Sequence, residues 1–149
     1  MKVFVAGATG AVGRALIPVL VKRQHRVVGT TSSANRVTAM SAMGAEPVLM
    51  DGLDAAAVLQ AVRAAKPDVI VHQMTALAGV KNLKHFDDAF AQTNRLRQEG
   101  TVHLIAAARE VGISRIIVQS YAGWTYAPDG DRLKTEEDPL DARERGQHR

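Results

Sequence analysis

The sequence contains no cysteine, which excludes disulfides and thiolate metal sites and fits a protein of the cytoplasm, the compartment we expect. It also lacks any run of 18 apolar residues, so it predicts no membrane-spanning helix, and we expect no signal peptide before the first strand. The five histidines never occur as H-x-x-x-H and have no accompanying carboxylate pair. We therefore expect no metal site.

The sequence has few clusters of like charge, although its net charge is +4. The basic residues are scattered, apart from the run at residues 22–26. That run is either a solvated helix end, which we favour because cations complement a helix C-terminus, or a nucleic-acid patch. We expect no nucleic-acid partner and no membrane partner.

Strand and helix patterns alternate along the 149 residues. Strands are predicted at residues 2–6, 26–30, 46–50, 68–72 and 115–119. Helices are predicted directly after the first strand, at residues 34–43, after an N-cap at Asp54, and at 87–111. This alternation predicts an α/β fold with a doubly wound parallel sheet, a three-layer Rossmann architecture with strand order 3-2-1-4-5. Ligands of such sheets bind at the carboxyl ends of the strands, near the switch point between strands 1 and 4.

The last residues differ in character from the rest. More than half of residues 129–149 are charged, and only Leu133 and Leu140 are strongly apolar. Such a segment buries too little surface to order itself. We expect one domain at residues 1–128 and a polar, partly disordered tail at 129–149.

Three glycines follow the first strand with the spacing G-x-x-G-x-x-G, and a helix pattern begins directly after them. Gly7 would allow a tight turn, Gly10 would let a diphosphate approach the backbone, and Gly13 would let the helix pack closely. The N–H groups and dipole of the helix N-terminus favour a bound phosphate. Pro18 falls inside this helix, where we expect a local kink. The residues expected to contact a dinucleotide here are Gly7, Thr9, Gly10, Ala11, Val12, Gly13 and Arg14.

The end of the second strand carries no acid that would accept the ribose hydroxyls of NAD. Thr31, Ser32 and Arg36, helped by Arg14, are suited to accept a 2′-phosphate instead. The sequence therefore favours NADP, with NAD still possible. In the alternative interpretation, residues 31–33 only cap the next helix.

Two further loops should face the same site. Asp51 and Gly52 follow the third strand, where a carboxylate can accept the adenine amino group; Asp51 is otherwise a turn residue. Gln73 and Met74 follow the fourth strand at the switch point, and we include them among the cofactor-binding candidates. His72 is either a general base or, as is more common at a strand end, a structural residue.

Together these positions resemble the extended short-chain dehydrogenase/reductase family, which includes the NAD-dependent epimerases and dehydratases. The resemblance covers about residues 1–140. It is carried by the glycine motif, a D-x-x-D at residues 51–54, an interrupted Asn-x-x-Gly-Thr at 93–101, the serine-bearing strand at 118–124, and the acidic segment at 135–140. The resemblance implies an NAD(P)-dependent oxidoreductase and makes Ser120 a candidate catalytic residue, although Tyr121 is an alternative occupant of that position.

The family's Tyr-x-x-x-Lys pair, which performs the proton chemistry, does not occur in this sequence. We therefore expect the cofactor-binding part of such an enzyme, truncated before that pair and before the substrate domain. The alternative is a non-enzymatic NADP-sensing regulatory protein. We also expect a homodimer or partner contact at the edge beyond the fifth strand or along the helix at residues 87–111.

Overall fold

The computed structural model describes residues 1–77, 86–120, 126–127, 129–130 and 132–141. The chain divides into two compact units, Met1–Val118 and Gln119–Arg149. The domain boundary expected at residue 128 stays a prediction. No helix within the described ranges combines the length and the hydrophobicity needed to cross a membrane.

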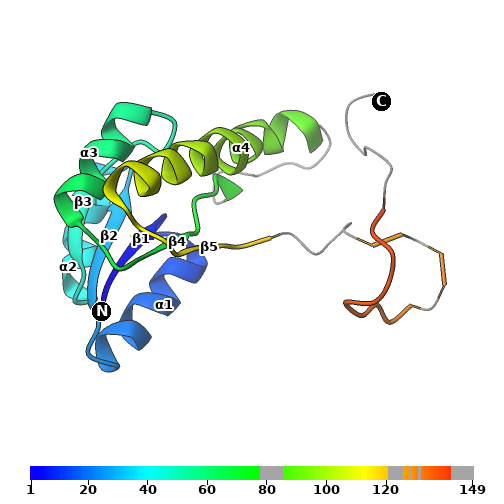
Figure 1. Cartoon of the computed structure of the whole chain (residues 1–149), viewed down its shortest axis with the longest axis horizontal. Helices are drawn as coiled ribbons and strands as arrows, with labels where there is room; N and C mark the ends of the chain where they lie inside the picture. The colour runs from blue at the N-terminus through cyan, green and yellow to red at the C-terminus, as the bar shows by residue number, and fades with distance from the viewer. Residues whose placement is uncertain (78–85, 121–125, 128, 131, 142–149) are drawn as a thin grey trace. The chain divides into compact units, whose positions relative to one another are not determined.

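The first unit is built on a five-stranded parallel sheet with the order β3-β2-β1-β4-β5 (Figure 1). The strand order and the parallel pairing confirm the predicted Rossmann-like topology. β1 is central and pairs with β2 on one side and with β4 on the other. The strands are β1 Lys2–Ala6, β2 Arg26–Thr31, β3 Glu46–Leu49, β4 Val69–His72 and β5 Ile116–Val118.

The helices lie close to their predicted places, with differences at their ends. The helix predicted at residues 34–43 is a 3-10 turn followed by a short α-helix, and the long helix begins one residue earlier than predicted. β2 is one residue longer than predicted because Thr31 pairs with Leu49. The helices are α1 Ala11–Lys22, η1 Ala34–Arg36, α2 Val37–Ala42, α3 Ala55–Ala65 and α4 Phe86–Val111.

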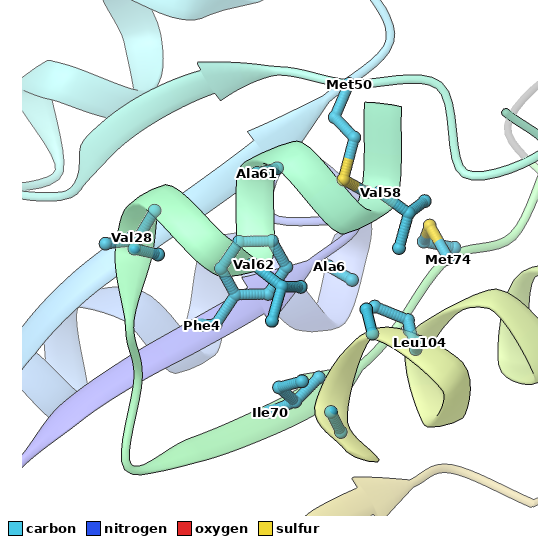
Figure 2. Packing of buried hydrophobic residues seen from close by; sticks show 13 residues of the cluster. Phe4, Ala6, Val28, Met50, Val58, Ala61, Val62, Ile70, Met74 and Leu104 are labelled. Atoms are coloured by element: carbon cyan, nitrogen blue, oxygen red, sulfur yellow. The ribbon is translucent and has the colours of Figure 1, made fainter. Parts of the chain in front are cut away.

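Helices cover both faces of the sheet, so the first unit has three layers. On one face, Val3 and Val5 of β1 join the core beneath α1 and α2. On the other face, Phe4 packs in a cluster with Val62 of α3 and Leu104 of α4 (Figure 2). Alternate residues of β1 therefore belong to different cores, which explains why this strand is a continuous apolar run.

Local signals account for where several helices begin and end. The Asp54 carboxylate accepts hydrogen bonds from the backbone N–H groups of Ala56 and Ala57, which confirms the predicted N-cap of α3. Gly44 and Gly112 follow α2 and α4 with φ angles of 86° and 84°, the left-handed conformation that glycine adopts most readily. α1 continues through Pro18 to Lys22, and the predicted kink stays a prediction.

In the second unit, the described residues include an isolated antiparallel bridge between Tyr126 and Leu140. The Ala127 N–H donates to the Pro139 carbonyl at 2.9 Å. Asp138 closes a local turn by accepting from the Thr135 N–H. Residues 142–149 of the predicted tail lie outside the described residues.

Candidate functional site

The sequence-predicted cofactor-binding residues lie at or soon after the carboxyl ends of β1, β2, β3 and β4, some of them in the loops and others in the helices that follow. Because the strands are parallel, these loops leave the same edge of the sheet. β1 separates β2 from β4, so the loop after β1 lies at the point where the strand order reverses. Ser120 belongs to the second unit, in which it is exposed, and Tyr121 lies outside the described residues.

Gly7 makes the tight turn that the sequence predicts, with a φ of 87°. Its Cα lies directly against the peptide between Gln73 and Met74. A Cβ at Gly7 would lie 2.6 Å from the Gln73 carbonyl carbon and 2.7 Å from the Met74 nitrogen. Only glycine satisfies both the backbone angle and this approach.

The N-terminus of α1 offers backbone donors. Gly10 is the N-cap residue, no side chain among the described residues caps it, and the first turn contains no acidic residue. Gly13 lets α1 pack against the turn after β1, because a Cβ there would lie 2.6 Å from the carbonyl oxygens of Gly7 and Ala8. Ala11 and Val12 are exposed at this helix end, which carries the positive end of the helix dipole and N–H groups without intrahelical partners.

Gly10 differs from the other two glycines of the motif. A Cβ built there would have one near neighbour, the Gly7 carbonyl oxygen at 3.3 Å, and its φ of −71° suits any residue. The fold itself therefore barely requires glycine at this position. The bare Cα leaves room over the first turn of α1, a cradle in which a diphosphate could approach the backbone.

The end of β2 is joined to the glycine loop by hydrogen bonds. The Ala8 N–H donates to the Thr30 carbonyl at 2.9 Å, and the hydroxyls of Thr9 and Thr31 lie 3.1 Å apart. Thr31 is 5% exposed, and its hydroxyl forms its hydrogen bonds within the protein. The cofactor contacts predicted for Thr9 and Thr31 stay predictions.

The other residues predicted near a 2′-phosphate are placed differently. Ser32, Arg36 and Arg14 are all exposed. Ser33 is the N-cap residue of η1, but no described side chain, its own included, caps that helix. Thr31 instead accepts a hydrogen bond from the Ser33 N–H at 3.2 Å, which shapes the loop. Ser32 and Arg36 therefore keep their side chains at the surface of the loop after β2.

The loop after β3 is held by α4. Asp51 accepts a hydrogen bond from the Leu53 N–H at 2.9 Å, which gives it the turn role, and its side chain is exposed. Gly52 is buried, and a Cβ there would lie 2.4 Å from the Met74 sulfur. His103 of α4 places Nδ1 3.1 Å from the Gly52 carbonyl oxygen. Gly100 of α4 also contacts Met74, since a Cβ there would lie 3.0 Å from the Met74 methyl carbon.

Met74 therefore has a side chain in the core rather than at the site surface; it is 7% exposed and lies near Leu104 (Figure 2). Its thioether fills the space between Gly52 and Gly100. Sequence reasoning missed His103 altogether, because no spacing in the sequence indicates its contact with Gly52. The Met74 N–H already donates to His72, and the cofactor contact predicted for Met74 stays a prediction.

His72 at the end of β4 is 3% exposed and accepts the Met74 N–H at Nδ1, 3.1 Å away. Burial is the main reason that its pKa lies below the usual value, with a smaller effect from the positive charge of Arg97. The backbone of Leu96 raises the pKa of His72, which opposes the effect of burial. The Leu96 carbonyl does not, however, reach hydrogen-bonding geometry with Nε2. Within the described residues, Nε2 of His72 and Oε1 of Gln73 have no partner. The structure thus gives His72 the structural role of a strand-end residue.

The loop after β4 has a second anchor on α4. Thr93 is buried, and its hydroxyl accepts a hydrogen bond from the Ala76 N–H at 3.0 Å. The loops after β3 and β4 are thus both fixed by side chains of α4.

Comparison with known proteins gives one family and several relatives. The family model described as "NAD dependent epimerase/dehydratase family" matches residues 3–145. A 3-diazoavenalumate denitrifying reductase of Streptomyces is 44% identical over 140 residues, which are 94% of this chain and 44% of the relative. A 2-alkyl-3-oxoalkanoate reductase of Stenotrophomonas maltophilia is 34% identical over 126 residues, 85% of this chain and 35% of the relative. The chain thus spans less than half the length of these curated relatives.

Solved structures agree with the fold. A UDP-glucose 4-epimerase of Thermus thermophilus in complex with NAD superposes with a TM-score of 0.75 at 24% identity, over 95% of this chain and 44% of the other. An anaerobillin reductase of Escherichia coli O157:H7 superposes with a TM-score of 0.60 at 25% identity, over 79% of this chain and 50% of the other.

The contact between Gly7 and the 73–74 peptide predicts a large difference between two alanine variants. Gly7 and Gly112 have φ angles of 87° and 84°, but a Cβ at Gly112 meets nothing within 4 Å. Gly112→Ala should lower the free energy of unfolding by about 1–2 kcal/mol, the cost of a left-handed alanine. Gly7→Ala should lower it by about 1–3 kcal/mol more, because the Cβ overlaps backbone.

Urea unfolding followed by circular dichroism measures both values, with Gly112→Ala as the matched control. Equal losses in the two variants would contradict the close approach of Gly7 to the 73–74 peptide.

Proposed function

This chain belongs to the NAD dependent epimerase/dehydratase family, and we propose that residues 1–118 bind a nicotinamide dinucleotide with its diphosphate over the first turn of α1. The observation that carries the proposal is the uncapped helix end at Gly10, where a missing Cβ leaves room that the fold does not use. Backbone N–H groups at a helix N-terminus are suited to bind a diphosphate, which needs several donors and a positive potential. The solved relative from Thermus thermophilus contains NAD, which supports this assignment.

In this proposal the residues of the chain bind and orient the cofactor. The Gly7 turn and Gly13 hold α1 close to β1, the Thr30 and Thr31 contacts fix the loop after β2, and His103 fixes the loop after β3. Asp51 retains its second carboxylate oxygen for the adenine amino group while the first holds the turn. When bound, the cofactor would supply hydride transfer to or from a carbonyl or alcohol carbon.

We propose that the whole protein catalyses a reduction. The curated relatives at 44% and 34% identity are both reductases, whereas the epimerases are similar in fold at 24% identity or less. Ser120 is the residue of this sequence that we propose acts on the substrate. The alternative is that this chain is a regulatory protein that senses NADP by binding it without turning over substrate.

We propose NADP as the preferred cofactor. The exposed loop after β2 carries Ser32 and Arg36 and no acid that would repel a 2′-phosphate, and the exposed Arg14 adds a positive charge. A guanidinium binds a phosphate through charge-assisted hydrogen bonds.

Gly10→Ala should weaken dinucleotide binding while preserving the fold. The new Cβ would approach only the Gly7 carbonyl oxygen, at 3.3 Å, so the free energy of unfolding should change by less than about 1 kcal/mol. The same Cβ would occupy the diphosphate cradle, and the Kd should rise about tenfold or more, a loss of about 1.4 kcal/mol of binding free energy. Calorimetric titration with NADPH measures the Kd, and thermal unfolding of the same variant is its control. Unchanged affinity would exclude the cradle as the diphosphate site.

Arg36→Ala should raise the Kd for NADPH by about tenfold or more and leave the Kd for NADH unchanged, because a charge-assisted hydrogen bond contributes about 1.5–3 kcal/mol. Arg23→Ala, which removes an exposed arginine at the opposite end of α1, is the matched control. Titration of the three proteins with both cofactors gives the comparison. A wild-type chain that binds NADH more tightly than NADPH would overturn the proposed preference.

We also propose that copies of the chain associate along α4 or the β5 edge. Val102 of α4 is 62% exposed and Ile117 of β5 is 52% exposed, so each element presents apolar side chains to solvent. Light scattering at tens of micromolar should give the mass of a dimer. Val102→Glu should produce monomers if α4 is the contact, and Ile117→Glu should do so if the edge is. A monomeric wild-type chain is the contrary result.

A further inference from the structure

Three loops at the carboxyl edge of the sheet begin with the same local hydrogen bond. In each, a side chain accepts the backbone N–H of the residue two positions further on. The pairs are Thr31 with Ser33 after β2 at 3.2 Å, Asp51 with Leu53 after β3 at 2.9 Å, and His72 with Met74 after β4 at 3.1 Å. A hydroxyl and an ionised carboxylate both remain acceptors around neutral pH, whereas an imidazole nitrogen stops accepting once it is protonated. The loop after β4 is therefore the one whose closing bond depends on pH.

The surroundings of His72 make its protonation costly. In the sheet it pairs with Ala6 of β1 and with Val118 of β5, neither of which is titratable. From α4, the Leu96 carbonyl and the positive Arg97 act on the ring. No carboxylate among the described residues contributes to its pKa, so an imidazolium at this buried position would lack a compensating negative charge.

The bond from Met74 supports other parts of the site. It fixes the 73–74 peptide, and Gly7 lies against that peptide with no room for a Cβ. The Met74 side chain in turn fills the space beside Gly52. Movement of this peptide would therefore shift the glycine loop after β1 and the loop after β3.

We propose that His72 is a pH-sensitive positioning residue for the cofactor: protonation at Nδ1 releases the Met74 N–H, displaces the 73–74 peptide from Gly7, and weakens dinucleotide binding. This inference rests on the proposed function of the glycine loop. It assigns His72 no contact with the cofactor or the substrate.

The direction of the pH effect follows from proton linkage. The pKa of His72 is lower in the folded chain than its unfolded value of 6.5, so the unfolded state binds more protons below that value. The stability contributed by neutral His72 is fully present above pH 6.5 and declines as the pH falls toward the folded pKa. Below the folded pKa, the fraction of binding-competent chain falls about tenfold per pH unit, and the apparent Kd rises by the same factor.

The decisive comparison is His72→Asn against the wild-type chain. An asparagine oxygen can accept an N–H two residues on, as the Asp51 carboxylate does, and it does not titrate. Titration with NADP⁺ from pH 8 down through the His72 titration midpoint, located by NMR, should show affinity falling more steeply in the wild-type chain than in His72→Asn. The 2′-phosphate of the cofactor titrates equally in both experiments, so the difference between them isolates His72. Parallel losses of affinity would overturn the proposal.

A second measurement does not depend on the cofactor. In the free wild-type chain, the NMR shift of the Met74 amide proton should follow the titration of the His72 imidazole. An amide shift that is independent of that titration would overturn the switch. If neither protein binds NADP⁺ or NAD⁺ at any pH, the proposed function fails and the cofactor part of this inference fails with it, and the Met74 shift then decides only whether protonation of His72 releases the Met74 N–H.

His72→Leu completes the set because it removes the acceptor at every pH. We expect it to bind NADP⁺ more weakly than His72→Asn already at pH 8, where wild-type His72 is neutral. Equal binding by the leucine and asparagine variants at that pH would count against a positioning role for the acceptor.

Discussion

The contact between the Gly7 Cα and the 73–74 peptide is the constraint on which the site depends. β1 and β4 are neighbours whose last paired residues are Ala6 and His72, so the chain must leave both strands through the same small volume. The Gln73 N–H donates to the Ala6 carbonyl at 2.8 Å, which holds the two exits together. A left-handed glycine turns the chain after β1 away from β4 and starts α1 over the sheet. The position of the α1 N-terminus, and with it the proposed diphosphate cradle, follows from that turn.

The features that could be predicted from the sequence are those with local causes. The apolar run of β1 reflects burial on both faces of a parallel sheet, and the Asp54 cap requires only backbone N–H groups two and three residues away. The positive φ angle of Gly7 and the close packing at Gly13 were predicted because glycine spacing encodes backbone geometry. Strand order followed from the alternation of strands and helices and from the handedness of crossovers.

The features that could not be predicted depend on pairs of residues far apart in the chain. Thr31 was predicted as a cofactor residue from its position, and the sequence did not indicate that its hydroxyl would lie 3.1 Å from that of Thr9. Asp51 allowed two interpretations from the sequence, and the Leu53 bond supplies the turn role without deciding the adenine role. The clamp from His103 to Gly52 joins residues 51 positions apart, and no spacing in the sequence indicates it.

The thioether of Met74 occupies space that a Cβ on Gly52 or on Gly100 would otherwise fill. The three positions come from different loops and a helix, yet they share one fixed volume. A side chain can grow at one of them only if another shrinks, since a packed interior has little spare space. In the descent of this protein, the three residues should therefore be inherited together, and a methyl group gained at either glycine should accompany a shorter residue at position 74.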